Sequence, residues 1–131
     1  MKTAVIGSGG WGTALAMLLL ENGNDVTLWS YTEEESRVLR ETGENPMLKG
    51  VPLPKELKLT TDLGCVAGCG VVVLATPSFA VRSTARQMAP HLTAGTVVVS
   101  VSKGIEKETS TTPTEAIHEE LGPNYPVVAL S

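Results

Sequence analysis

The sequence predicts a doubly wound α/β fold, in which helices cover both faces of a parallel sheet. Short apolar runs typical of buried strands alternate along the chain with segments of helical periodicity. A glycine-rich turn follows the first of these runs directly. With 13 glycines, one Phe and 42% hydrophobic residues among its 131 residues, the chain has a composition typical of parallel α/β proteins. We therefore expect one domain over residues 1–131, built with right-handed crossovers.

The predicted strands are apolar runs that stop at glycine, proline or polar turn residues. The run of Val and Leu that ends at Thr76-Pro77 is the most continuous, and we expect it at the centre of the sheet. In chain order the strands are Thr3–Ile6, Asp25–Trp29, Leu57–Thr60, Val71–Ala75, Thr96–Val101 and Val127–Leu130.

The predicted helices lie between these strands, and two of them begin with a capping box. In each box the Thr hydroxyl caps the helix, and the Glu three residues later reaches back to the Thr amide. The helices cover Thr13–Glu21, Thr32 to about Glu41, Asp62 to about Ala67, a part of Ser78–Pro90 with Val81, Ala85 and Met88 facing inward, and Thr112 to Gly122. Asn45–Pro54 is predicted to be a loop.

Charge and composition exclude several classes of function. A net charge of -4 gives no basic field for nucleic acid or an anionic membrane. Each apolar run is shorter than the ~18 residues of a membrane span. The chain leads from Met1 straight into a strand, so we expect no signal peptide and a cytoplasmic location. Cys65 and Cys69 are expected to be buried small residues rather than metal ligands, and His91 and His118 to be surface residues.

The first turn carries the strongest chemical signal in the chain. Gly7-Ser8-Gly9-Gly10-Trp11-Gly12 satisfies G-x-G-x-x-G between a strand and a helix, as a dinucleotide-binding loop requires. Gly7 would permit the tight turn, Gly9 the approach of a pyrophosphate, and Gly12 the packing of the helix on the strand. The helix N-terminus would offer free amides to the phosphates. A plain connecting turn is the alternative, which the flanking strand and helix argue against.

The end of the second strand bears on the choice between NAD and NADP. An acidic residue is expected there to bind the ribose diol of NAD. The strand instead ends in Ser30-Tyr31-Thr32, and Glu33 to Glu35 are explained by capping of the next helix. This tip would not repel the 2′-phosphate of NADP, yet it holds no Arg or Lys to bind it. Ser30 and Tyr31 could hydrogen-bond a ribose or a ribose phosphate, so the cofactor is NADP or NAD, with NADP accepted.

Two further strand ends offer candidate ligand contacts, because doubly wound folds bind ligands beyond the carboxyl ends of their strands. Pro77 would expose backbone beside the cofactor, or simply terminate its strand. Lys103 follows an apolar strand and could contact a substrate phosphate as a point charge. The alternative for Lys103 is an exposed loop lysine. From the residues alone, the chain is a dinucleotide-binding module without an assigned reaction.

Several motifs together resemble bacterial NAD(P)-dependent glycerol-3-phosphate dehydrogenase. The run from Ile6 to Ala16, with Trp11 inside the glycine motif and Gly-Thr-Ala after it, resembles the first loop of that family. Val26–Trp29 resembles its second strand, Asn45–Pro54 its following loop, and Ser102–Glu106 its S-K-G-I-E segment. The likeness covers essentially the whole chain.

The resemblance implies an oxidoreductase that interconverts dihydroxyacetone phosphate and sn-glycerol 3-phosphate with NADPH or NADH, for phospholipid synthesis. It implies that the loop around Gly10 and Trp11 contacts the cofactor, and that Lys103 contacts both cofactor and substrate. Tyr31 and Thr32 fall where many members carry His or Arg for the adenosine ribose phosphate. A homodimeric parent enzyme is part of the same expectation.

The resemblance also implies what lies outside this sequence. In the family, the strand resembling Val127–Ser131 continues into Gly-Pro-Ser-x-Ala at the substrate site, and the general acid–base lysine belongs to a second, helical domain. We therefore expect the cofactor-binding part of a two-domain enzyme, with no catalytic residue of its own and negligible turnover alone. Two alternatives stay open: another hydroxy-acid dehydrogenase of the same superfamily, and a non-enzymatic NAD(P)-binding module.

Overall fold

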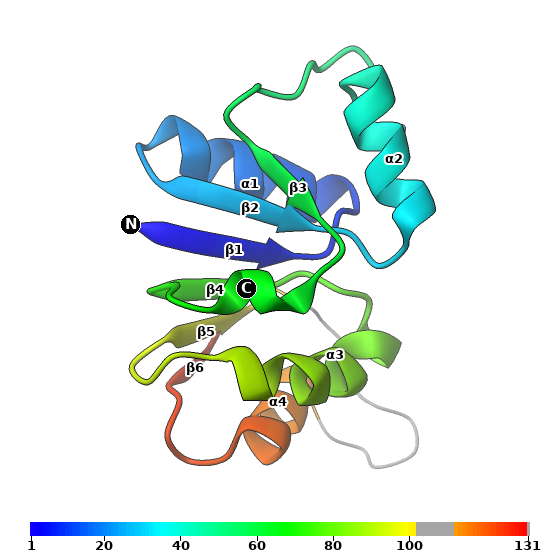
Figure 1. The fold of residues 1–131 in the computed structure, drawn as a ribbon. Coiled ribbons are helices and arrows are strands. Elements are labelled where there is room, and N and C mark those ends of the chain that lie inside the picture. The colour runs from blue at the N-terminus through cyan, green and yellow to red at the C-terminus, as the bar shows by residue number, and fades with distance from the viewer. Residues whose placement is uncertain (102–111, 131) are drawn as a thin grey trace.

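The computed structural model describes residues 1–101 and 112–130, and over these it contains one six-stranded sheet with helices on both faces (Figure 1). All strand pairs are parallel, and the strand order is β3-β2-β1-β4-β5-β6. The strands are β1 Lys2–Ile6, β2 Asp25–Trp29, β3 Lys58–Thr60, β4 Val71–Leu74, β5 Val97–Ser100 and β6 Val127–Ala129. The doubly wound fold class is therefore confirmed.

The helices follow the predicted order with small shifts at their ends. The α-helices are α1 Gly10–Glu21, α2 Glu33–Thr42, α3 Val81–Met88 and α4 Pro113–Leu121. Three single turns of 3₁₀-helix, η1 Leu63–Val66, η2 Ser78–Ala80 and η3 Ala89–His91, account for the short helix after Asp62 and for the two ends of the Ser78–Pro90 segment. The second half of the glycine motif, Gly10–Gly12, thus forms the first turn of α1, with Gly9 as the N-cap.

Two apolar clusters attach the helices to the sheet. One face of the sheet packs against α1 and α2, where Ala16 and Leu39 are buried with β-strand side chains such as Leu28. The other face packs against η1, α3 and α4. Val81, Ala85 and Met88 are all buried in this second cluster, as the helical spacing predicted. Figure 1 shows α1 behind the strands and α3 in front of them.

The strand order places a crevice at the carboxyl edge of the sheet. β1 pairs with β2 on one side and with β4 on the other, so the direction of winding reverses between β1 and β4. Ile6 is level with Trp29 of β2 and with Leu74 of β4, so the three strands end together. The loops after them diverge from this line, and a doubly wound sheet binds its ligand at such a point.

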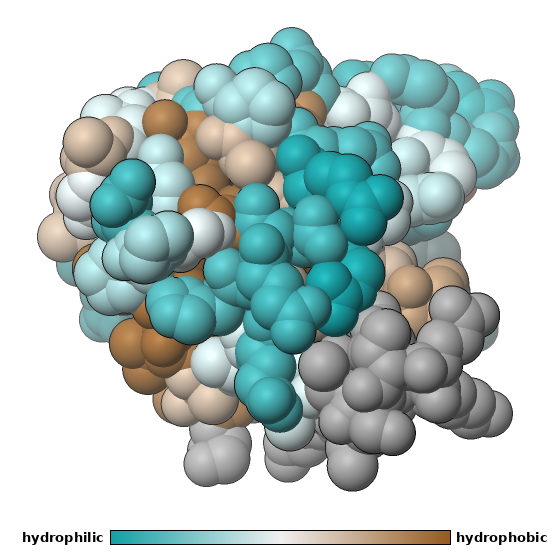
Figure 2. All heavy atoms as spheres, turned by 90° about the horizontal axis from the view of Figure 1, so that it is seen from below, coloured by the Kyte–Doolittle hydropathy of each residue, from teal (hydrophilic) through white to brown (hydrophobic). Residues whose placement is uncertain are grey.

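The end of the molecule formed by α4 and β6 has a mainly hydrophilic surface. Figure 2 views this end from below and shows a broad hydrophilic area, with apolar side chains gathered toward one side. Ion pairs between α3 and α4 contribute to it: Arg82 pairs with Glu119 at 2.8 Å and with Glu120 at 2.9 Å, and Arg86 pairs with Glu120 at 2.9 Å.

Candidate dinucleotide-binding site

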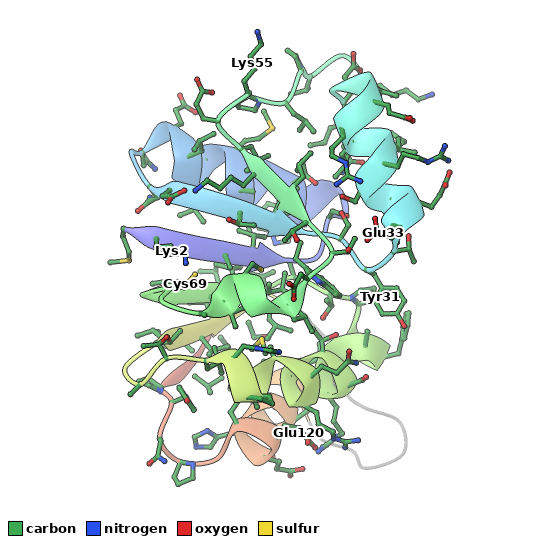
Figure 3. All side chains as sticks on the ribbon, viewed as in Figure 1. Lys2, Tyr31, Glu33, Lys55, Cys69 and Glu120 are labelled. Carbon is green, nitrogen blue, oxygen red and sulfur yellow. The ribbon has the colours of Figure 1, made fainter. Side chains whose placement is uncertain are left out.

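A large pocket lies at the carboxyl edge, over the ends of β1, β2 and β4. Its volume is about 1020 Å³, and its walls come from the glycine motif, the tip of β2, the start of α2 and the segment after β4. Figure 3 shows Tyr31 projecting at this edge, close to the start of α2. The pocket extends from the helix start to the far side of the strand tips, as an elongated ligand with phosphates in its middle requires.

Two glycines of the motif are required by the backbone itself. Gly7 has φ +125°, a conformation that side chains with a Cβ rarely adopt, and a Cβ there would meet the Ala75 carbonyl oxygen at 2.7 Å. A Cβ at Gly12 would lie 2.1 Å from the Gly7 carbonyl oxygen. These contacts confirm the tight turn at Gly7 and the close approach of α1 that the motif predicted for Gly12.

Gly9 differs from these two, because its backbone would accept any residue. Its φ of -65° and ψ of 178° are ordinary extended values. Within the described part of the structure, a Cβ built on Gly9 meets no atom within 4 Å. Gly9 is also the N-cap of α1, and a glycine cap leaves the first amides of the helix uncovered. The fold therefore does not require a glycine at this position. Gly9 lines the pocket, and the space in front of it is open.

Most of the predicted contact residues come together around the pocket. It is lined by Gly7, Ser8, Gly9, Trp11, Tyr31 and Pro77. Gly10 and Gly12 belong to the first turn of α1, and Ser30 is fully buried behind the loop, where its hydroxyl donates to the Ser8 hydroxyl at 2.8 Å. Lys103, predicted to contact cofactor and substrate, lies outside the described residues.

The pocket wall is largely apolar and aromatic. Trp11, Tyr31 and Phe79 line it with exposed fractions of 61%, 67% and 84%. Behind them Trp29 is buried and packs edge-on against Tyr31, with ring centroids 6.1 Å apart. Phe79 was not identified from the sequence. It is the single Phe of the chain and follows Pro77-Ser78 just beyond the end of β4, and that position was the available signal.

One detail of the predicted helix capping is wrong. The Thr32 hydroxyl accepts from the Glu35 amide at 3.1 Å, as expected. The Glu35 carboxylate, however, accepts from hydroxyls: from Thr32 at 3.2 Å and from Ser8 at 3.3 Å. Glu35 thus joins α2 to the glycine motif and lines the pocket, a role that its place in a capping signature concealed.

Asn45 is a buried polar residue that the sequence analysis did not single out within its loop. Its side-chain amide donates to the Ser8 carbonyl at 2.8 Å and to the Thr13 hydroxyl at 2.7 Å, and its oxygen accepts from the Met47 amide at 2.9 Å. The Thr13 hydroxyl also donates to the Ser8 carbonyl, at 3.3 Å. The loop after α2 therefore fastens the glycine motif from behind.

The two cysteines and two histidines lie away from this pocket. Burial raises the pKa of the Cys65 thiol to about 11 and also raises the pKa of Cys69, so both stay protonated near neutral pH. Cys69 is buried as predicted, whereas Cys65 is half-buried. His91 and His118 are exposed, which confirms their predicted surface position.

The described residues contain no group of three or more His, Cys, Asp or Glu side chains that could hold a metal ion. A helix long and apolar enough to cross a membrane is likewise missing from the described part.

The family of the chain follows from comparison with known proteins. Residues 2–131 match the model of the N-terminal region of NAD-dependent glycerol-3-phosphate dehydrogenase. The chain belongs to this family. The resemblance read from Trp11 and the neighbouring motifs is therefore confirmed.

Curated relatives and solved structures agree with this assignment. Glycerol-3-phosphate dehydrogenase [NAD(P)+] of Moorella thermoacetica is 50% identical over 119 residues, which cover 89% of this chain and 36% of the relative. The chain therefore spans little more than a third of that relative's length. The crystal structure of the Coxiella burnetii glycerol-3-phosphate dehydrogenase is 33% identical with a TM-score of 0.87, over 97% of this chain and 39% of that one. The Saccharomyces cerevisiae enzyme is 26% identical with a TM-score of 0.81, over 97% and 41%.

Proposed function

We propose that this chain binds NAD(P)H for an oxidoreductase that interconverts sn-glycerol 3-phosphate and dihydroxyacetone phosphate. The curated relatives are named glycerol-3-phosphate dehydrogenase [NAD(P)+], and the family match covers residues 2–131. When bound, the nicotinamide ring supplies the hydride. The residues described above have the tasks of binding the cofactor, orienting it and excluding water from it.

The observation that carries the proposal is the open backbone at Gly9. Gly7 and Gly12 are glycines because the fold leaves no room for a side chain, but Gly9 lies in open space at the N-terminus of α1. A helix N-terminus whose first amides are uncovered favours a phosphate. We assign the pyrophosphate to the amides around Gly9 and Gly10, and the flanking rings and ribose to the pocket walls at Trp11, Tyr31 and Pro77.

Substitution of Gly9 tests this assignment without disturbing the fold. Gly9→Val should leave the chain folded and remove binding of NADH, because its methyl groups would occupy the approach to the amides. Circular dichroism and thermal melting report the fold, and fluorescence titration with NADH reports binding. Ala94→Val, exposed before β5 at the opposite edge of the sheet, is the matched control and should bind as the unmodified chain does. An unchanged NADH affinity in folded Gly9→Val would refute the assignment.

The reaction, location and assembly state need separate tests. The proposed reaction predicts NADH or NADPH oxidation that depends on dihydroxyacetone phosphate, measured on the protein at its native length. Oxidation with 2-keto acids instead would favour another hydroxy-acid dehydrogenase, and nucleotide binding without any oxidation would favour a binding module. The proposal also includes a cytoplasmic location, tested by cell fractionation, and a homodimeric enzyme, tested by light scattering.

A further inference from the structure

The dinucleotide pocket has one charged residue in its described lining, and that residue is Glu35. The other described lining residues are glycines, small polar residues, aliphatic residues and aromatic residues. A carboxylate in a pocket wall distinguishes ligands by their charge at that point. The position of Glu35 therefore bears on which nicotinamide dinucleotide the pocket accepts.

Glu35 is held against the phosphate-binding loop by hydroxyl groups. The Ser30 hydroxyl donates to Ser8 at 2.8 Å, and the Ser8 hydroxyl donates to the Glu35 carboxylate at 3.3 Å. This row of side chains runs from the tip of β2 through the glycine motif to the first turn of α2. Ser30 is fully buried, so the exposed end of this row is the Glu35 carboxylate.

Glu35 lies at the position where doubly wound folds bind the adenosine ribose of a dinucleotide. In doubly wound folds the ribose lies by the end of the second strand, next to the glycine motif, and an acidic residue there accepts from its hydroxyls. The strand tip of this chain carries no acid, but Glu35 brings a carboxylate to the same junction from α2. A helix residue thus replaces the strand residue.

The two arginines of α2 form ion pairs with other glutamates of the same helix. Arg37 pairs with Glu34 and, at 3.9 Å, with Glu41. Arg40 lies 3.8 Å from Glu33. These pairs lie on the exposed side of the helix, and the described lining of the pocket contains neither Lys nor Arg. A second phosphate beside Glu35 would meet a negative charge with no described cation to neutralise it.

We propose that Glu35 is the specificity-determining residue of the pocket and makes this chain prefer NADH to NADPH. The carboxylate accepts from the ribose hydroxyls of NADH and repels the 2′-phosphate of NADPH, which carries close to two negative charges near neutral pH. The assignment rests on the proposed dinucleotide function. It reverses the expectation that NADP is accepted, which was based on the lack of an acidic residue at the tip of the second strand. The tip residues could not show that a carboxylate from α2 lies against the glycine motif.

Titration of the chain with NADH and with NADPH tests the assignment directly. We expect NADH to bind about tenfold tighter or more, since like charges in contact are strongly unfavourable. Glu35→Gln should bring the two dissociation constants to within about twofold of each other, mainly by tightening NADPH. Glu33→Gln is the matched control: it makes the same change in the same helical turn outside the pocket lining, and should leave the ratio unchanged.

A second measurement needs no variant and therefore does not depend on the folding of Glu35→Gln. Repulsion between charges is screened by salt, so raising the ionic strength from about 0.05 to 0.5 M should narrow the NADH preference. Equal or tighter binding of NADPH by the unmodified chain would overturn the assignment while leaving the dinucleotide function intact, as would a folded Glu35→Gln with an unchanged ratio. Failure of both nucleotides to bind would overturn the proposed function and this assignment together.

Discussion

Helices α2 and α4 begin with the same signature, Thr-x-x-Glu, and complete it in different ways. In α4 the Thr112 hydroxyl accepts from the Glu115 amide at 3.2 Å, and the Glu115 carboxylate accepts from the Thr112 amide at 3.1 Å. In α2 the first bond is present, but the Glu35 carboxylate bonds to the Thr32 and Ser8 hydroxyls. The signature specifies a helix start in both cases, and the neighbouring loop decides what the glutamate does.

The two helices also differ in how their charges are used. α4 pairs with α3 through Arg82, Arg86 and Glu120, so its charged side chains hold two helices together (Figure 3). The arginines of α2 pair within their own helix, and α2 together with the loop after it holds the glycine motif instead. The start of α4 thus contributes to local stability, whereas the start of α2 also contributes to the wall of the proposed dinucleotide pocket.

The largest effect on this comparison should come from removing the loop contact that follows α2. Asn45→Ala deletes the buried hydrogen bond to Thr13 and the part-buried bonds to Ser8 and from the Met47 amide, and should lower the free energy of unfolding by about 2–4 kcal/mol. It should also weaken NADH binding, because the loop that carries Gly9 loses its support. Urea unfolding and NADH titration measure the two effects.

The control for Asn45 is the same change at a site remote from the pocket. Asn24→Ala removes one bond to the Leu19 carbonyl at the other end of α1. It should cost less stability and leave NADH affinity unchanged. If Asn45→Ala behaved like Asn24→Ala in both measurements, the loop after α2 would have no part in the site.

An intermediate effect should come from the two cap residues, which differ in their surroundings rather than in their chemistry. Thr32→Ala and Thr112→Ala should each lower the free energy of unfolding by about 1 kcal/mol. Thr32→Ala alone should also reduce the preference for NADH, because it frees the Glu35 carboxylate from one of its two hydroxyl partners. If Thr112→Ala changed the ratio of the NADH and NADPH dissociation constants as much as Thr32→Ala does, the proposed difference between α2 and α4 would be refuted.

The smallest effect should be the acid sensitivity of the contact between α3 and α4. Hydrogen bonds from Arg86 and Arg82 lower the pKa of Glu120 to about 2. Because the pKa is lower in the folded chain, this stabilisation is complete above the ordinary glutamate pKa and is lost as the pH falls toward about 2. Between about pH 6 and pH 3, the melting temperature should therefore fall less for Glu120→Gln than for Glu119→Gln. In the unmodified chain, the Glu119 carboxylate contacts Arg82 from a more exposed position.

The fold was predictable because its signals are local. The runs around Val71–Leu74 and Val97–Ser100 alternate with helical segments whose caps and glycines lie within a few residues of each end. Right-handed crossovers then limit the strand orders that such alternation can take, and the structure shows which of them this chain adopts. The motif turn was predictable for the same reason, since Gly7 and Gly12 act on each other over five residues.

The contacts that complete the site were not predictable in this way. Glu35 meets Ser8 across 27 residues, and Asn45 meets Ser8 across 37. Both come from segments that have a sufficient local explanation, one as a helix start and one as a loop. When a local role already explains a residue, the sequence gives no sign of a second role. The three-dimensional structure is needed to show that the same residue also contacts a distant segment.

The central position of β1 has a consequence for how the protein is made. β1 precedes both of its sheet partners in the chain: β2 follows it after one helix, and β4 follows only with Val71–Leu74. Parallel pairing over such sequence separations forms slowly. Until then the nascent chain exposes an apolar strand with two open edges, which is the form most prone to pairing with other chains.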